Sequence, residues 1–394
     1  MINQDVYALG AAPNQIREIF AYGIRRKAEI GADKVFDLSL GNPSVPTPAC
    51  VDAAIERYGA QSDGLTHGYT ESAGLASVRQ AMAEHLNARF GQSYTGANVY
   101  VTSGASSSLA IALRGLVNPG EEVIVNAPYF PEYQTWIFNA GGTCVEVPTR
   151  ADDFQLDVPA IEAAITEKTA MVIINSPNNP VGAVYSDQNL ADLAAALQRG
   201  SERVGHPIYL LSDEPYRELY YNGCKPAWVP SVYANTVVAY SWSKSMSLPG
   251  ERIAYVLVPD TMPGWEEVFL AIAGGGRALG HICASILFQQ VVAECIDAPV
   301  DKEPYDVNRK LLAAGLEDIG YTFVKPQGAF YMWIEALEPD ANAFCERAKA
   351  HELLLVPSDG FGVKGWVRAG YCCGQDVIEG SLPAFKALWE EYHH

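Results

Sequence analysis

The feature that most constrains this chain is a series of short apolar runs in its middle, rich in β-branched and aromatic residues. The apolar residues are consecutive rather than alternating, which indicates strands buried on both faces, as in a parallel sheet covered by helices. Seven such strands are predicted, at residues 99–101, 123–125, 144–147, 171–174, 208–211, 237–240 and 253–256.

The segments between most of these runs are long enough to hold a helix, and residues 189–197 (NLADLAAAL) have helical character. Strands that alternate with helices predict right-handed crossovers and parallel strands. The last interval, from residue 240 to 253, contains a Pro249-Gly250 turn and is too short for a helical crossover, so the final strand is expected to be antiparallel. The prediction is an α/β fold with a mainly parallel, seven-stranded sheet in three α/β/α layers.

The two ends of the chain have a different pattern. Residues 14–30 place isoleucines on one helical face, and residues 305–394 alternate helix-like segments with short strands. We expect both ends to form a smaller α+β domain from residues 1–44 and 286–394, beside a large cofactor-binding domain at residues 45–285.

Charge limits the choice of partners. The 46 acidic residues outnumber the 27 basic ones, for a net charge of −19, which repels nucleic-acid phosphates and anionic lipid surfaces. No signal peptide or membrane-spanning run is visible, so a cytoplasmic protein is expected. The eight cysteines form no C-x-x-C pair, and His206 and His281 lack companions at metal-ligand spacing, so no metal is expected.

Polar motifs follow four of the predicted strands, at the strand ends where ligands bind in open α/β sheets. The motifs are TSGASSSL from residue 102, NSPNNPVG from 175, SDEPY from 212 and SWSKSMSLPGER from 241. The first of these would suit a phosphate at a helix N-terminus, although by itself it also reads as an ordinary serine-rich helix cap.

Taken in order, these motifs resemble the class I/II aminotransferases, pyridoxal-phosphate enzymes of fold type I, most closely those of the aspartate aminotransferase type. The resemblance extends from Gly41-Asn42-Pro43 to Gly365-Trp366-Val367-Arg368 and so covers most of the chain. It implies that pyridoxal 5'-phosphate is the cofactor, and that the substrates are an amino acid and a 2-oxo acid.

The resemblance also assigns catalytic roles. Lys244 would bind the cofactor aldehyde covalently and, once displaced, move a proton as a general base. Asp213 would face the pyridine nitrogen and keep the ring protonated, although an aspartate at this place could also be a simple helix cap. Asn179 and Tyr216 match the pair that hydrogen-bonds the ring oxygen.

The cofactor phosphate is expected to be held by side chains and backbone N–H groups of Ser241, Ser243, Arg252, Ala105 and Ser106. Phe130 matches the aromatic residue that stacks on the ring, although a phenylalanine here could also be a core residue. Tyr69 matches a tyrosine that reaches the phosphate bound by the partner subunit, which implies a homodimer with shared active sites.

Recognition of the substrate is expected to begin with Arg368, which matches the arginine that binds the α-carboxylate through two parallel hydrogen bonds. Gly41 would add a backbone donor, and Asn179 would also contact substrate. Arg277 lies near the place where some relatives bind a dicarboxylic side chain from across the dimer, so aspartate and 2-oxoglutarate are the best guess for the substrate pair. An aromatic or neutral amino acid stays open, as does a lyase on the same scaffold.

Overall fold

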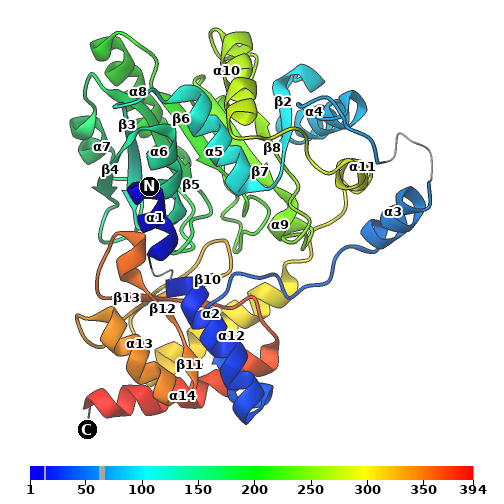
Figure 1. Cartoon of the computed structure of the whole chain (residues 1–394). Coiled ribbons are helices and arrows are strands. Elements are labelled where there is room, and N and C mark those ends of the chain that lie inside the picture. The colour runs from blue at the N-terminus through cyan, green and yellow to red at the C-terminus, as the bar shows by residue number, and fades with distance from the viewer. Residues whose placement is uncertain (13–14, 62–66, 394) are drawn as a thin grey trace.

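The centre of the molecule is a seven-stranded sheet with the order β2-β8-β7-β6-β5-β3-β4, shown in Figure 1. The structure is a computed structural model that describes residues 1–12, 15–61 and 67–393. The strands are β2 Val99–Thr102, β3 Glu122–Ala127, β4 Thr143–Pro148, β5 Thr169–Asn175, β6 Tyr209–Asp213, β7 Thr236–Ser241 and β8 Ala254–Leu257. All seven predicted strands are therefore confirmed, with small changes at their ends.

The antiparallel strand is also where the sequence placed it. The β3, β4, β5, β6 and β7 strands pair in parallel, whereas β8 is antiparallel to both of its neighbours, β7 and β2. The first strand of the sheet in chain order thus pairs only with the last.

Alternation along each strand assigns the two faces of the sheet. In β3 and β5, the residues Val123, Val125, Met171 and Ile173 pack in one apolar cluster with α5, α6 and α10. Their neighbours, such as Ile124 and Val172, pack on the opposite face with α7 and α8. Because both faces are covered, the large sheet lies in the middle of three layers.

The helices of these layers have the following bounds. On one face lie α5 Ala105–Leu116, α6 Glu132–Ala140 and α10 Trp265–Ala278. On the other face lie α7 Val158–Ala164 and α8 Asp187–Val204, and, in a third cluster, α3 Ala49–Gly59, α4 Ala76–Phe90 and α11 Ile286–Glu294. The short α9, Trp242–Ser245, follows β7 directly.

The ends of the chain build a second apolar core below the large sheet in Figure 1. Its antiparallel sheet has the order β12-β13-β10-β9, with β9 Phe323–Val324, β10 Tyr331–Glu335, β12 Val356–Pro357 and β13 Trp366–Gly370. A parallel pair joins β1 Phe36–Asp37 to β11 Leu353–Leu354, so the N-terminal segment is tied to the C-terminal part. The helices here are α2 Gln15–Ile30, α12 Glu303–Ile319, α13 Ala341–Ala350 and α14 Gln375–His393.

This arrangement confirms the predicted smaller α+β part built from both chain ends, while the exact boundary at residues 44/45 and 285/286 stays a prediction. The predicted helix over residues 14–30 is α2, and its first residue, Asn14, lies outside the described residues. None of the helices within the described ranges is both long and apolar enough to cross a membrane.

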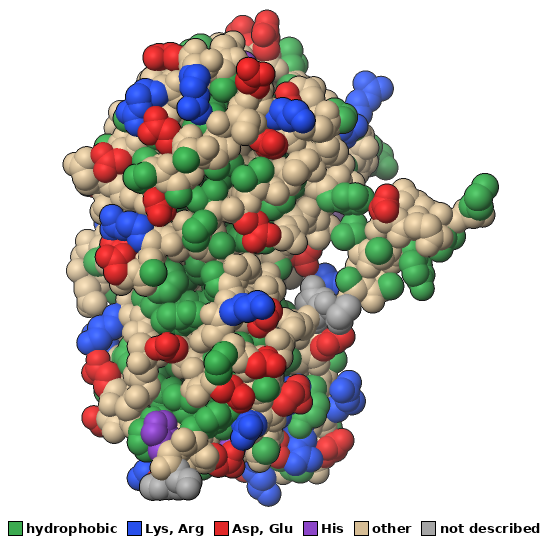
Figure 2. Space-filling view, turned by 90° about the vertical axis from the view of Figure 1, so that its left-hand side faces the viewer, with side chains coloured by type: hydrophobic (Ala, Val, Ile, Leu, Met, Phe, Trp, Pro, Cys, Tyr) green, Lys and Arg blue, Asp and Glu red, His purple; other side chains and the backbone are tan. Residues whose placement is uncertain are grey.

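The first helix, α1 Gln4–Ala11, stands apart from both cores. None of its residues is buried, and Val6 and Tyr7 are more than half exposed. Figure 2 shows it projecting from the body, with hydrophobic side chains on its surface. Such an uncovered apolar helix is unusual for a monomer and is typical of an interface.

Candidate active site

A cavity of about 250 Å³ lies where the carboxyl ends of the parallel strands meet the smaller sheet. Twelve of the predicted site residues line it: Gly41, Ala105, Ser106, Phe130, Asn179, Asp213, Tyr216, Ser241, Ser243, Lys244, Arg252 and Arg368. Its position at the ends of β5, β6 and β7 is the one expected for a ligand site in an open α/β sheet. Polar groups that are distant in sequence therefore converge on one cavity.

Lys244 extends into this cavity from α9, immediately after β7. Its Nζ donates a hydrogen bond to the backbone oxygen of Gly41 at 2.5 Å and lies 5.3 Å from the centre of the Phe330 ring. Burial lowers the pKa of Lys244 to about 8, and the positive charges of Arg368 and Arg252 act in the same direction. Near neutral pH a fraction of this amine is therefore uncharged and nucleophilic.

Asp213 ends β6 and is only 5% exposed. One carboxylate oxygen, Oδ2, accepts a hydrogen bond from the Tyr133 hydroxyl at 2.6 Å. The other, Oδ1, is buried without a hydrogen-bond partner among the described residues. Burial raises the pKa of Asp213 to about 7, against the opposing effect of Tyr133. A positively charged group beside Oδ1 would relieve this cost, so the carboxylate is prepared to receive a cation.

One end of the cavity is suited to an anion. Gly104 has a φ of 91° and leads into the N-terminus of α5, whose first backbone N–H groups, at Ala105 and Ser106, have no partner within the helix. A Cβ atom on Gly104 would stand 2.3 Å from Nη2 of Arg252. The buried Ser241 hydroxyl lacks a hydrogen-bond partner among the described residues. Donors and positive charge therefore gather at one point.

The antiparallel β8 explains how these groups meet. Ala254 is paired with Thr102 on one side and with Ser241 on the other. Arg252, two residues before Ala254, is thereby brought to the edge of the sheet where β2 and β7 end. A side chain at position 104 would require this guanidinium to move, and the positive φ there also favours glycine.

Arg368 enters the cavity from β13 of the smaller sheet and is 3% exposed. Its Nη1 donates to Oδ1 of Asn179 at 3.0 Å, and its Nη2 donates to the backbone oxygen of Ser39 at 2.8 Å. Its Nε is buried without a partner among the described residues. The guanidinium is thus held in place and has hydrogen-bonding capacity left for a ligand.

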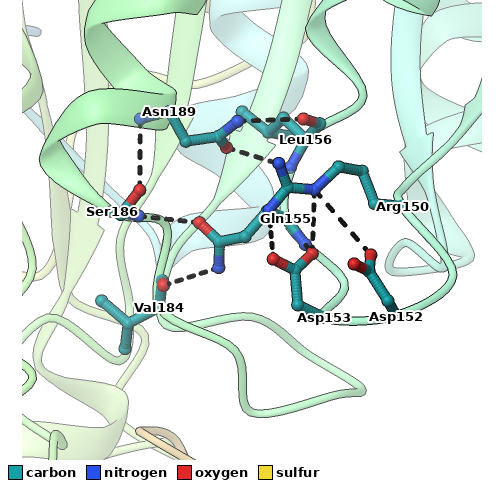
Figure 3. Close-up of polar contacts among 8 residues, drawn as sticks. All are labelled: Arg150, Asp152, Asp153, Gln155, Leu156, Val184, Ser186 and Asn189. Carbon is teal, nitrogen blue, oxygen red and sulfur yellow. Dashed lines mark hydrogen bonds and ion pairs between the residues drawn. The ribbon is translucent and has the colours of Figure 1, made fainter.

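The segment after β5 carries Asn179, and hydrogen bonds shown in Figure 3 hold the C-terminal end of this segment. The amide of Gln155 donates to the backbone oxygen of Val184 at 3.0 Å and accepts from the backbone N–H of Ser186 at 2.8 Å. Asn189 adds two hydrogen bonds to the backbone of Leu156. These contacts connect the loop after β4 to the segment between β5 and α8.

Two predicted residues lie outside the cavity. Tyr69 is 90% exposed, and Arg277 is exposed in the last turn of α10. Both were expected to act across a dimer, so their roles stay predictions.

The sequence did not reveal several residues of the site. Tyr331 lines the cavity and its hydroxyl lies 3.0 Å from that of Tyr216, while Ile16, Leu109 and Trp136 supply apolar wall. Tyr133 lies behind Asp213. The only available signal was the density of aromatic residues at 129–136, which does not distinguish a core from a cavity wall.

The fold and the cavity define an enzyme of pyridoxal-phosphate fold type I. The family model of aminotransferases class I and II matches residues 33–379, and the chain belongs to this family. It is 32% identical to the aspartate/prephenate aminotransferase of Thermus thermophilus, over 89% of this chain and 90% of the relative. It is therefore a transaminase.

Solved structures show the same architecture. An amino transferase from Eubacterium rectale superposes with a TM-score of 0.97 at 46% identity, covering 100% of both chains. The aspartate aminotransferase from Thermus thermophilus with maleate has a TM-score of 0.88 at 29% identity, covering 98% of this chain and 99% of the other.

Class I and II aminotransferases of this type use pyridoxal phosphate, and the residues present here fit it. Three buried atoms of the cavity wall have no partner in the described part of the chain: Asp213 Oδ1, Ser241 Oγ and Arg368 Nε. The first would face the ring nitrogen, the second the phosphate, and the third a substrate carboxylate. Their chemistry matches the three polar ends of a cofactor with its bound substrate.

Proposed function

We propose that this aminotransferase transfers the amino group of aspartate to 2-oxoglutarate, in a homodimer whose two active sites are shared between subunits. The observation that carries this proposal is the convergence of Lys244, Asp213 and Arg368 on one cavity. Bound pyridoxal phosphate supplies an aldehyde that accepts the amino group and an electron-withdrawing ring that stabilises negative charge on the substrate α-carbon.

Each residue then has a defined task. Arg368 binds the α-carboxylate and orients the substrate against Lys244, whose amine removes the proton from the α-carbon and later returns it. A pKa near 8 suits this exchange, because the amine can both accept and release a proton close to neutral pH. Asp213 holds a proton on the ring nitrogen through its unpartnered Oδ1.

The choice of aspartate rests on the named relatives and on Arg277, which would reach the dicarboxylic side chain from the partner subunit. Among the described residues, the cations that line the cavity are Lys244, Arg252 and Arg368, and each already has a proposed task. We propose that a second carboxylate is bound by a cation of the partner subunit.

A second candidate has its own support. The wall of the cavity includes Ile16, Leu109, Phe130 and Trp136, which favour an aromatic or other apolar side chain. Some of this wall would contact the cofactor ring, but Ile16 and Trp136 have no such predicted role. An aromatic amino acid is thus the alternative amino donor.

Kinetics of one arginine variant separate the two candidates. Arg277→Ala should raise KM for aspartate by about tenfold or more and change KM for phenylalanine little, because only aspartate loses an ion pair. Arg114→Ala, which removes another exposed arginine, serves as the control. Equal effects on both amino acids would remove the basis for aspartate. Stoichiometric formation of the new amino acid, rather than release of ammonia, would distinguish transfer from lyase activity.

The homodimer is supported by two exposed features. The ring of Tyr69 and the apolar residues of α1 have no cover within the described chain. A mixture of the Lys244→Ala and Tyr69→Ala proteins, unfolded and refolded together, tests the shared site. Mixed dimers contain one site with both residues intact, so activity should return above that of either protein alone. If the mixture is no more active than its components, the site is complete within one chain.

A further inference from the structure

Two cysteines meet at the contact between α3 and α11. Cys50 is the second residue of α3, and Cys295 directly follows the last residue of α11. The two helices pack together, and the side chain of Cys50 makes a hydrogen bond with that of Cys295. Two thiols in such contact need only a small movement of their side chains to reach the length of a disulfide bond.

The surroundings position this pair of cysteines. Arg57 of α3 forms an ion pair with Glu294, the last residue of α11. Cys295 is 2% exposed in an apolar cluster, and Cys50 packs against the same cluster. Because packing and an ion pair already join α3 to α11, the fold brings the two thiols together before any bond forms between them.

The two cysteines differ in their access to solvent. Both line a cavity of about 690 Å³, but Cys50 is partly exposed whereas Cys295 is buried. Cys50 also lies in the first turn of an eleven-residue helix, a place where backbone N–H groups favour the reactive thiolate. Burial, together with the contact to Cys50, raises the pKa of Cys295 to about 12, so its thiol is protonated near neutral pH. A small oxidant should therefore react with Cys50 first.

The pair also lies where the chain passes between its two apolar cores. Leu38, before α3, belongs to the core of the smaller part, and α12, after α11, packs in that core again. Cys50 and Cys295 lie in the apolar cluster that covers the large sheet with α4. A bond between them would join the two connecting segments, residues 39–48 and 296–302, close to the point where each meets the large sheet.

We propose that Cys50 and Cys295 form a reversible disulfide within one chain when the enzyme meets hydrogen peroxide. Peroxide transfers one oxygen to the Cys50 thiol, which becomes a sulfenic acid, and one water is released. The Cys295 sulfur then attacks the Cys50 sulfur. The S–S bond forms, the S–O bond breaks, and hydroxide leaves with the proton of Cys295 as a second water. One peroxide is thus reduced as two thiols are oxidised, and an added dithiol reverses the change by thiol–disulfide exchange.

Peptide mapping of the holoenzyme tests this proposal. After treatment with hydrogen peroxide, the remaining thiols are blocked with iodoacetamide and the protein is digested with trypsin in the absence of reductant. Cys50 lies in the tryptic peptide 35–57 and Cys295 in the peptide 278–302. We expect these two peptides to be recovered mainly as one cross-linked species, which dithiothreitol separates. Thiol titration of the denatured protein should show the loss of two of its eight thiols.

The chain offers a matched control, because Cys283 lies in the same tryptic peptide as Cys295. Cys50→Ser and Cys295→Ser should each abolish the cross-linked species, whereas Cys283→Ser should leave its yield unchanged. Fragmentation of the cross-linked species in the mass spectrometer identifies which cysteine of the longer peptide is joined. Because Cys50 is partly exposed, its variant decides the question even if Cys295→Ser fails to fold.

The proposal is overturned if the two peptides stay separate after peroxide treatment, or if the cross-link joins Cys283 instead of Cys295. A covalent dimer on a non-reducing gel that Cys50→Ser abolishes would also overturn it, because the bond would then join two chains rather than two helices of one chain. Transamination is measured in a separate assay, so failure of this proposal leaves the proposed function standing.

Discussion

Replacement of Asp213 by asparagine should make the cofactor-free protein more stable while abolishing its function. In the absence of a cation, Tyr133 is the single hydrogen-bond donor to the buried Asp213 carboxylate among the described residues, and burial raises the pKa of Asp213 from 3.8 to about 7. At roughly 1.4 kcal/mol per pKa unit, ionisation of this carboxyl destabilises the folded state by about 4 kcal/mol. Asparagine has the same shape without the charge, and its oxygen can still accept from Tyr133.

The effect depends on pH in a defined direction. Because the pKa of the folded carboxyl lies above its ordinary value, its favourable contribution is present at low pH and is lost as pH rises through about 7. The cofactor-free Asp213→Asn protein should therefore match the wild type near pH 4 and exceed it by up to about 4 kcal/mol at pH 8. Urea unfolding of both proteins, stripped of cofactor, measures this difference across the pH range.

Addition of cofactor should reverse the order, because a protonated ring nitrogen beside Oδ1 pairs with the charge that asparagine lacks. Replacement of the exposed Asp318 by asparagine is the control and should change little at any pH. The reasoning is refuted if the cofactor-free wild type is as stable as Asp213→Asn at pH 8, or if their difference does not vary between pH 4 and pH 8.

Three further outcomes are expected. The rate at which Lys244 is acetylated in the cofactor-free protein, measured by mass spectrometry of its peptide, should have a pH midpoint near 8. This lies well below the value of about 10.4 typical of exposed lysines. A midpoint near 10 would contradict the argument that burial lowers the pKa of this amine. Gly104→Ala should weaken cofactor binding by about tenfold or more in dialysis, because the added Cβ would displace Arg252. The control is Gly120→Ala, at a similar φ of 88° but with open space around it. This control should lose only about 1 kcal/mol of stability and keep its affinity for the cofactor. Arg368→Lys should raise KM for the amino donor by about tenfold or more in steady-state assays, because lysine cannot make two parallel hydrogen bonds; an unchanged KM would place the α-carboxylate elsewhere.

The large sheet was predictable because its signals are local. Runs such as 171–174 are short, apolar at every position and rich in β-branched residues, as expected for a strand covered on both faces. The short interval before residue 253 predicted an antiparallel strand. The positions of Lys244, Asp213 and Arg252 followed from family motifs at the ends of these strands.

The rest depended on contacts between distant segments. The hydrogen bond from Tyr133 to Asp213 joins residues 80 apart, and that between Tyr216 and Tyr331 joins residues 115 apart. A tyrosine in an aromatic segment carries no sign of which partner its hydroxyl will meet.

The pairing of β2 solely with β8 has a consequence for how the protein is made. During synthesis on the ribosome, residues 99–102 emerge long before residues 254–257, yet they have no other strand to pair with. The anion-binding end of the site, which needs both Gly104 and Arg252, therefore cannot close until the nascent chain has grown past residue 257. Pyridoxal phosphate must therefore bind after the first 250 or so residues have folded, and it cannot guide their folding.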